Sequence, residues 1–177
     1  MPIVVNGSLE TQMAELKWFD GYSGQTIDQL LSLEGQYRTD SLVVAIEQAI
    51  GQKAARQGDK SLTAEEQIVL AVEALESEVN NGGYSQYFVN RHELAPIIVE
   101  SLLRIHCPKT AEISTEAIHA LNLPILDAAA INTAMIADNE RRDDILHQCD
   151  EAYHETGEDI AGQLFSFVKA NKGQIKL

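Results

Sequence analysis

The apolar residues of this chain recur at helical spacing over most of its length. From Thr26 onward they stand three or four positions apart, which places them on one side of an α-helix. Glycine or proline stands near the ends of several such segments, where helices commonly stop or start. The pattern predicts helices over residues 26–34, 41–57, 63–79, 96–106, 109–121, 124–138, 141–155 and 158–171. The sequence therefore predicts an all-α fold, a single orthogonal multi-helix domain.

The first residues have a different pattern. Ile3, Val4 and Val5 are β-branched and are followed by Asn6 and Gly7, so they could form one short edge strand or an unsettled arm. We therefore divide the chain into an N-terminal arm, residues 1–22, and a helical domain, residues 23–177. The chain of 177 residues is long enough to bury one sizeable core and too short for two full domains.

The third predicted helix has the clearest ends. Thr63 is followed three residues later by Glu66, a pair that satisfies the exposed amide groups of a first helical turn reciprocally. We expect this helix to end at Asn80, Asn81, Gly82 and Gly83, because these residue types accept the positive φ of a chain reversal.

Residues 126–137 are unusually rich in alanine. Small side chains let neighbouring helices approach closely. We therefore expect the helix that contains them to lie at the centre of the domain.

The charge of the chain is strongly acidic. It has 27 Asp and Glu against 13 Lys and Arg, which gives a formal net charge of -14. Such a protein is repelled by nucleic acid and by anionic membranes, so we expect neither as a direct partner. A basic protein is the favoured partner. The alternative is that the acidity serves only solubility.

Other features argue against several kinds of function. Only Cys107 and Cys149 are present, both among apolar helical residues, where a buried thiol is more common than a reactive one. The start of the chain lacks a basic segment followed by a long apolar core, so we expect a cytoplasmic protein. No Gly-rich phosphate loop and no nucleophile elbow is present. We expect no cofactor and no enzymatic activity.

The best candidate for catalysis is the helix predicted over residues 141–155. Asp144 and His147 are three positions apart, and Glu151 and His154 repeat that spacing, which occurs among the ligands of di-metal helical bundles. A metal-binding protein or hydrolase that uses His147 and His154 is therefore the alternative function. In such bundles the ligands converge from several helices, whereas here a projection at about 100° per residue places both pairs on the polar side of one helix. We expect no metal site.

The same segment concentrates the acidic charge. Between Asp138 and Asp159 there are nine acids and only two arginines, Arg141 and Arg142, which leaves -7, half of the total. Carboxylates three or four positions apart on a helix have Cβ atoms roughly 5 to 6 Å apart, so the row could imitate the phosphates of a nucleic-acid strand. We predict that a basic partner binds Glu140, Asp143, Asp144, Asp150, Glu151, Glu155, Glu158 and Asp159.

A second motif is the run EVNNGGYSQYFVN, which ends at Asn90. It resembles the hallmark of a family of domains of unknown function that is named for an acidic DNA-mimic protein. The resemblance extends over about 150 residues, because Tyr22 to Ser41 and Asp143 to Asn171 are similar to the beginning and end of that family. It implies an acidic all-helical protein, allows a homodimer, and suggests a partner such as a transcription regulator, whose DNA-binding surface the protein would occupy.

The hallmark itself is interpreted as structural. Its Asn residues can hydrogen-bond the turn, its glycines supply backbone freedom and its aromatic residues can fill the core beside it. The residues concerned are Glu76, Glu78, Asn80, Asn81, Gly82, Gly83, Tyr84, Gln86, Tyr87, Phe88 and Asn90.

Overall fold

The computed structural model describes residues 15–177 and confirms the all-α prediction. This part of the chain contains eight α-helices and no β-strand. The stretch from Ile3 to Gly7 lies outside the described residues. Two short 3-10 helices, η1 (Asp59–Ser61) and η2 (His92–Leu94), flank the third α-helix. The α-helices are α1 (Ile27–Leu31), α2 (Thr39–Gln57), α3 (Ala64–Asn90), α4 (Ala95–Arg104), α5 (Pro108–Ala120), α6 (Ala128–Ile136), α7 (Glu140–Glu155) and α8 (Ile160–Ala170).

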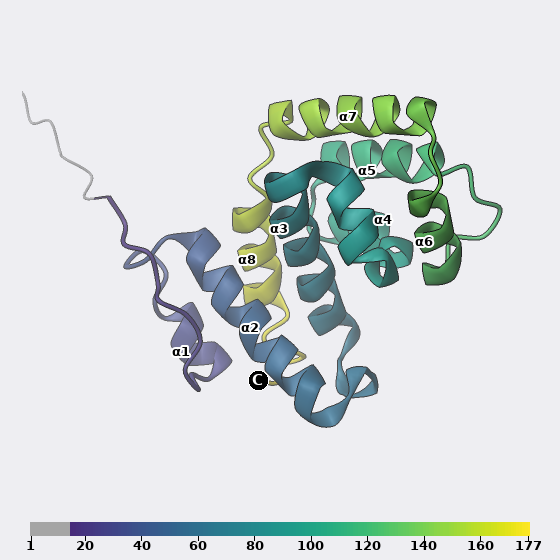
Figure 1. Ribbon diagram of the computed structural model, residues 1–177. Helices are drawn as coiled ribbons and strands as arrows, with labels where there is room; N and C mark the ends of the chain where they lie inside the picture. Colours follow the sequence, from purple (N-terminus) through teal and green to yellow (C-terminus); the bar gives the residue numbers. More distant parts are fainter. Residues whose placement is uncertain (1–14) are drawn as a thin grey trace, which may run out of the picture.

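The central helix is α3. It contacts α2, α4, α6, α7 and α8, which surround it in Figure 1. The predicted capping pair at its start is confirmed, because the Glu66 amide donates to Thr63 Oγ1 at 3.1 Å and the Thr63 amide donates to Glu66 Oε2 at 2.9 Å. Leu75 and Val79 lie in the core with almost no exposed surface. The other helices are therefore positioned by their contacts with α3.

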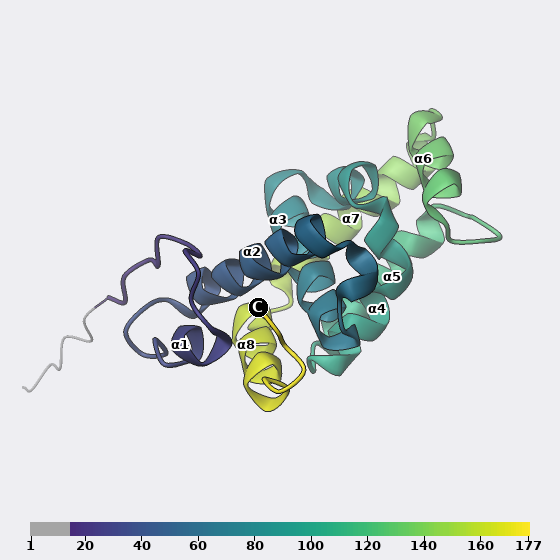
Figure 2. The same cartoon turned by 90° about the horizontal axis from the view of Figure 1, so that it is seen from below.

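The prediction that the alanine-rich helix is central is wrong. In α6 only Ile131 is buried, and Ile136 is 76% exposed. Figure 2 shows α6 at the end of the molecule farthest from α1. Burial of apolar area drives packing, and alanine side chains offer little of it, so the core is built instead by the larger side chains of α2, α3 and α8.

The predicted end of the third helix is confirmed in position, because the backbone is non-helical at Gly82 and Gly83, but a second helical part that was not predicted follows directly. The helix is interrupted at Gly82 and Gly83 and then continues through Tyr84 to Asn90. Gly82 has an extended φ of -161°, and the positive φ is found only at Gly83, at 77°. The first helical part of α3 therefore ends here and the second begins at a sharp bend, which is visible at the upper end of α3 in Figure 1.

The described part of the predicted arm lies against α1 and α2. The Arg38 amide donates to the Lys17 carbonyl at 2.8 Å, and the Phe19 amide donates to Ser41 Oγ at 3.0 Å. The rings of Phe19 and Tyr37 meet edge to face, with their centroids 5.2 Å apart. Within residues 15–177 none of the helices combines the length and the apolar character that crossing a bilayer requires.

Candidate functional site

The acidic side of α7 faces away from the core, as the helical projection predicted. Leu146, Cys149 and Tyr153 are buried against α3 and α5, because they share one side of the helix. Asn139 fixes the start of α7, since its side chain accepts a hydrogen bond from the Arg142 amide at 3.0 Å. Packing on one side leaves the opposite side exposed, and it carries Glu140, Asp143, Asp144, His147, Glu151, His154 and Glu155.

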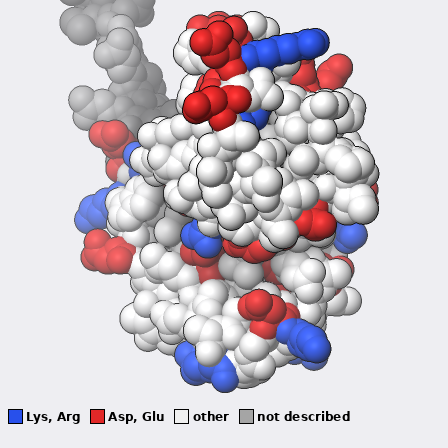
Figure 3. Space-filling model, turned by 45° about the vertical axis from the view of Figure 1, so that its right-hand side comes forward, with Lys and Arg blue, Asp and Glu red and all other residues white. Residues whose placement is uncertain are grey.

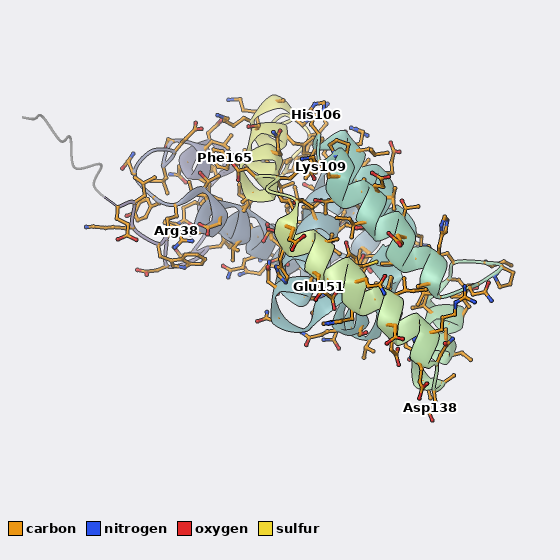
Figure 4. The ribbon with its side chains drawn as sticks, turned by 90° about the horizontal axis from the view of Figure 1, so that it is seen from above. Arg38, His106, Lys109, Asp138, Glu151 and Phe165 are labelled. Carbon is orange, nitrogen blue, oxygen red and sulfur yellow. The ribbon has the colours of Figure 1, made fainter. Side chains whose placement is uncertain are left out.

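A second helix extends this acidic side. Figure 4 shows α5 and α7 lying side by side, with Lys109 at the start of α5 and Glu151 on α7. Glu112 and Glu116 of α5 are exposed and line a shallow groove of about 350 Å³ together with Glu155 of α7 and one cation, Lys109. The sequence analysis missed these two glutamates. Their spacing of four residues predicts a shared outer face, but only the packing of α5 on α7 places them beside the other acids.

We define the α5–α7 acidic surface by five of its exposed carboxylates, which are Glu112, Glu116, Asp144, Glu151 and Glu155. One of the two arginines in the acidic segment does not reach this surface. Arg142 is 5% exposed, and its Nε and Nη2 donate to Asp143 Oδ1 at 2.8 and 2.7 Å. Its Nη1 donates to the carbonyls of Ala134 and Ala137. Arg142 therefore joins α6 to α7 and pairs with Asp143 instead of with one of the five carboxylates.

Two acids of the predicted partner-binding set are used as helix caps. Glu158 accepts hydrogen bonds from the amides of Lys109 and Thr110 at 2.9 and 2.8 Å and from the Thr110 hydroxyl at 2.7 Å. Partial burial raises the pKa of the Glu158 carboxyl, but these hydrogen bonds outweigh it and the pKa is lowered overall. Asp159 accepts from the Gly162 amide at 3.0 Å and so caps α8. The two carboxylates hold α5 and α8 in place beside α7.

A third predicted acid, Asp150, docks α7 onto the bend in α3. Its Oδ1 accepts the Tyr84 amide at 2.7 Å, at the first residue after the two glycines. A Cβ atom at Gly83 would overlap the Asp150 carboxylate, and the positive φ at this position already disfavours any other residue. Glycine at position 83 is thus required both by the backbone and by the approach of α7.

The polar residues of the hallmark close the same bend. Glu78 Oε2 accepts from the side-chain amides of Gln86 and Asn90 at 2.7 and 2.9 Å, and Arg91 lies 3.4 Å from its other oxygen. The two helical parts of α3 are therefore joined across the bend. In addition, the side chains of Asn80 and Asn81 donate to the carbonyls of Glu76 and Ser77, each at 2.7 Å. Each carbonyl is four residues before its asparagine, so these bonds hold the two side chains against the last regular turn before the bend.

The aromatic residues of the hallmark fill the core next to the bend. Tyr84, Tyr87 and Phe88 are each at most 1% exposed. The Tyr84 hydroxyl and Ser114 Oγ of α5 are 2.8 Å apart, and the Tyr84 ring meets the Tyr153 ring of α7 edge to face at 6.1 Å. The hallmark therefore connects α3 to both helices of the α5–α7 acidic surface, and this geometry favours its structural interpretation.

The two histidines of the alternative function lie on the outside of α7. His147 Nε2 is 3.7 Å from Glu151 Oε1, and both side chains are largely exposed. Across the part of the chain that the structure describes, no group of three His, Cys, Asp or Glu side chains is arranged to hold a metal ion. The two cysteines are buried, as predicted, and burial raises the pKa of Cys107 to about 12 and that of Cys149 to about 11.

An unexpected group of acids lies between α2 and α3. Glu73 is only 9% exposed and none of the described residues donates a hydrogen bond to its side chain. Burial, followed by the nearby charges of Glu76, Glu47 and Asp40, raises the pKa of Glu73 to about 8. Burial and Asp159 raise the pKa of Glu76 to about 7. At neutral pH Glu73 is therefore mostly protonated, and the charge of the folded protein is less negative than its composition suggests.

Comparison with protein families gives a match. A family model described as DMP19-like protein matches residues 60–171, which is more than half of the chain. The matched region includes α3 through α8, and with them the bend and the α5–α7 acidic surface. No curated protein matches the sequence, and no solved structure matches it.

Proposed function

Since the chain belongs to the DMP19-like protein family, we propose that it is an acidic binding protein whose α5–α7 acidic surface occupies the DNA-binding surface of a basic partner. A transcription regulator is the kind of partner that the family resemblance suggests. The protein would act as a DNA mimic, because its carboxylates would take the positions of phosphates on the partner.

The observation that carries this proposal is the arrangement of exposed carboxylates on two adjacent helices. Glu112 and Glu116 on α5 lie across a groove from Glu155 on α7, with Lys109 as the one cation in its lining, so the exposed carboxylates form a double row instead of a single stripe. The carboxylates are free of intramolecular caps, unlike those of Glu158 and Asp159. DNA-binding proteins gain most of their affinity from Lys and Arg that neutralise phosphates, and such side chains are complementary to this double row.

The proposal requires binding to depend on electrostatics. Exposed charges are screened over a Debye length of about 10 Å at about 0.1 M salt, so the complex should weaken as salt is added. The partner should bind either this protein or DNA, but not both at once. The protein itself should not bind DNA, because both are acidic.

The partner is identified by affinity pull-down from the native cell with elution by salt. Its affinity is then measured at low and high salt for the native protein and for the triple variant Asp144→Asn, Glu151→Gln, Glu155→Gln. We expect the variant to bind at least about tenfold more weakly while its circular dichroism stays unchanged, because the three side chains are exposed.

A matched control removes the same charge elsewhere. Glu15, Asp20 and Glu100 are exposed and lie outside α5 and α7, so the variant Glu15→Gln, Asp20→Asn, Glu100→Gln has the same net charge as the first. We expect it to bind like the native protein. If both variants bind equally weakly, the affinity depends on net charge and not on the α5–α7 acidic surface. If the affinity does not change with salt, the protein is not a DNA mimic.

A further inference from the structure

A second hollow lies away from the α5–α7 acidic surface. It is a cleft of about 470 Å³ between α2, η1, the first part of α3, η2 and α4, and no residue of α5 or α7 lines it. Figure 3 shows this face, with acidic side chains in and around the hollow. Apolar side chains form much of its lining, namely Leu62, Leu70, Ala74, Leu94 and Ile97. Its size and apolar lining are typical of sites that bury a ligand or a few side chains.

The charged residues of this cleft are mostly acidic. Glu47, Asp59 and Glu93 line it together with one cation, Arg91. Arg91 also lies 3.4 Å from a carboxylate oxygen of Glu78, which is outside the cleft, so the cation is already shared with another acid. The electrostatic environment therefore favours a cationic group.

One wall of the cleft contains a glycine in the middle of a helix. Gly51 lies within α2, where glycine is disfavoured relative to alanine. Its φ is not positive, so no backbone requirement explains it. A Cβ atom built there would meet only Glu47 Oε1, at 3.9 Å, which is ordinary contact distance. The absence of a side chain at Gly51 leaves space in the cleft.

We propose that this cleft binds a short amphipathic segment of a partner protein, which places apolar side chains on Leu70, Leu94 and Ile97 and a Lys or Arg against Glu47 and Glu93. The segment would bind as a helix whose apolar face enters an apolar groove, which is a common mode of peptide recognition. The acids that line the cleft select a segment with a basic residue beside its apolar face. This site does not depend on the α5–α7 acidic surface and could act with it or without it.

The test uses a fluorescein-labelled peptide, Leu-Lys-Lys-Leu-Leu-Lys-Lys-Leu-Leu-Lys, and measures binding by fluorescence anisotropy. Two control peptides replace every leucine by serine or every lysine by glutamate. We expect only the first peptide to bind, because the cleft requires both apolar and cationic side chains.

The steric variant is Gly51→Leu. Its side chain would project into the cleft, and leucine favours a helix more than glycine does, so the variant should fold at least as stably as the native protein. We expect the Kd for the first peptide to rise at least about tenfold. A melting temperature that is unchanged or higher would show that the loss is not caused by unfolding.

The charge variants locate the site. The double variant Glu47→Gln, Glu93→Gln should weaken binding, whereas Glu151→Gln, Glu155→Gln, which removes the same charge from α7, should not. Amide shifts in an NMR titration should occur around Gly51, Ala74 and Ile97.

Two results would overturn the proposal. The first is Gly51→Leu protein that binds the peptide as well as the native protein does. The second is binding that is lost in the α7 variant and kept in the cleft variants, which would place the peptide on the α5–α7 acidic surface and leave the function proposed above intact.

Discussion

Replacing Glu73 by glutamine should stabilise this protein, and the gain should increase with pH. The Glu73 carboxyl is 9% exposed, lies near three other acids and has a pKa raised from 4.5 to about 8. Ionising it in the folded state therefore costs free energy that the unfolded chain does not incur. Glutamine has nearly the same shape as the protonated side chain but cannot ionise. It should keep the packing between α2 and α3 and remove this cost.

The direction of the pH dependence follows from proton linkage. Because folding raises the pKa, the native state holds the proton more tightly, and unfolding between pH 4.5 and about 8 releases it. The stability of the native protein should thus decrease as the pH rises through this window. Below pH 4.5 both states are protonated, so the variant and the native protein should have similar stability there.

The pKa shift of Glu73 sets an upper limit on the stabilisation expected from Glu73→Gln. One pKa unit corresponds to about 1.4 kcal/mol, so the full displacement of the Glu73 pKa sets an upper limit on the order of 5 kcal/mol. Part of the pKa shift of Glu73 comes from repulsion by Glu76, Glu47 and Asp40. These carboxylates can take up protons themselves as Glu73 ionises, which makes the real cost smaller than this limit. We expect a gain of roughly 1 to 3 kcal/mol above about pH 8.

The assay is urea unfolding at about pH 5, 7 and 9, followed by circular dichroism, with the free energy of unfolding obtained by linear extrapolation. Glu100→Gln is the control, because Glu100 is exposed on α4 and should give no such pH dependence. A Glu73→Gln protein that is less stable than the native protein at high pH, or whose advantage is the same at all three pH values, would refute the reasoning.

Two further predictions concern the contacts that hold α7 and α5 in place. Gly83→Ala should lower the free energy of unfolding by about 2 kcal/mol. Alanine at this position has the cost of a positive φ, and its Cβ would displace Asp150 and break the hydrogen bond from the Tyr84 amide. A melting temperature equal to that of the native protein would contradict this prediction. Glu158→Gln should cost about 1 kcal/mol at neutral pH through loss of the charged cap. Since folding lowers the pKa of Glu158, its contribution is present above pH 4.5 and disappears as the pH falls through the lowered value, so urea unfolding of the two proteins should converge in acid.

Local patterns in the sequence predicted the local features of the fold. The boundaries of α5 and α7 were predicted to within one residue, because the periodicity of apolar residues and the nearby proline depend only on neighbours along the chain. The same periodicity predicted which side of α7 is buried. The capping pair of Thr63 and Glu66 was recognised for the same reason, since its two hydrogen bonds join residues three positions apart.

The bend in α3 was predicted only in part from the sequence. Gly82 and Gly83 correctly predicted where the first helical part ends, but the second helical part and its direction depend on partners at a distance. Glu78 has to reach Gln86 and Asn90 across the bend, and Asp150 has to approach from another helix.

Only the tertiary structure decided which residues share a surface. The alanine content of α6 indicates how closely another helix could approach, but it does not say that one does. Likewise, Glu112 and Glu116 join the acids of α7 because α5 packs beside it, and Glu73 is buried in the part of the fold where α2 packs against α3. One physical reason explains the position of α6, the position of the α5 glutamates and the burial of Glu73. Hydrogen bonds and periodicity within a helix are determined by residues a few positions apart, whereas burial and electrostatic proximity depend on residues that are distant along the chain.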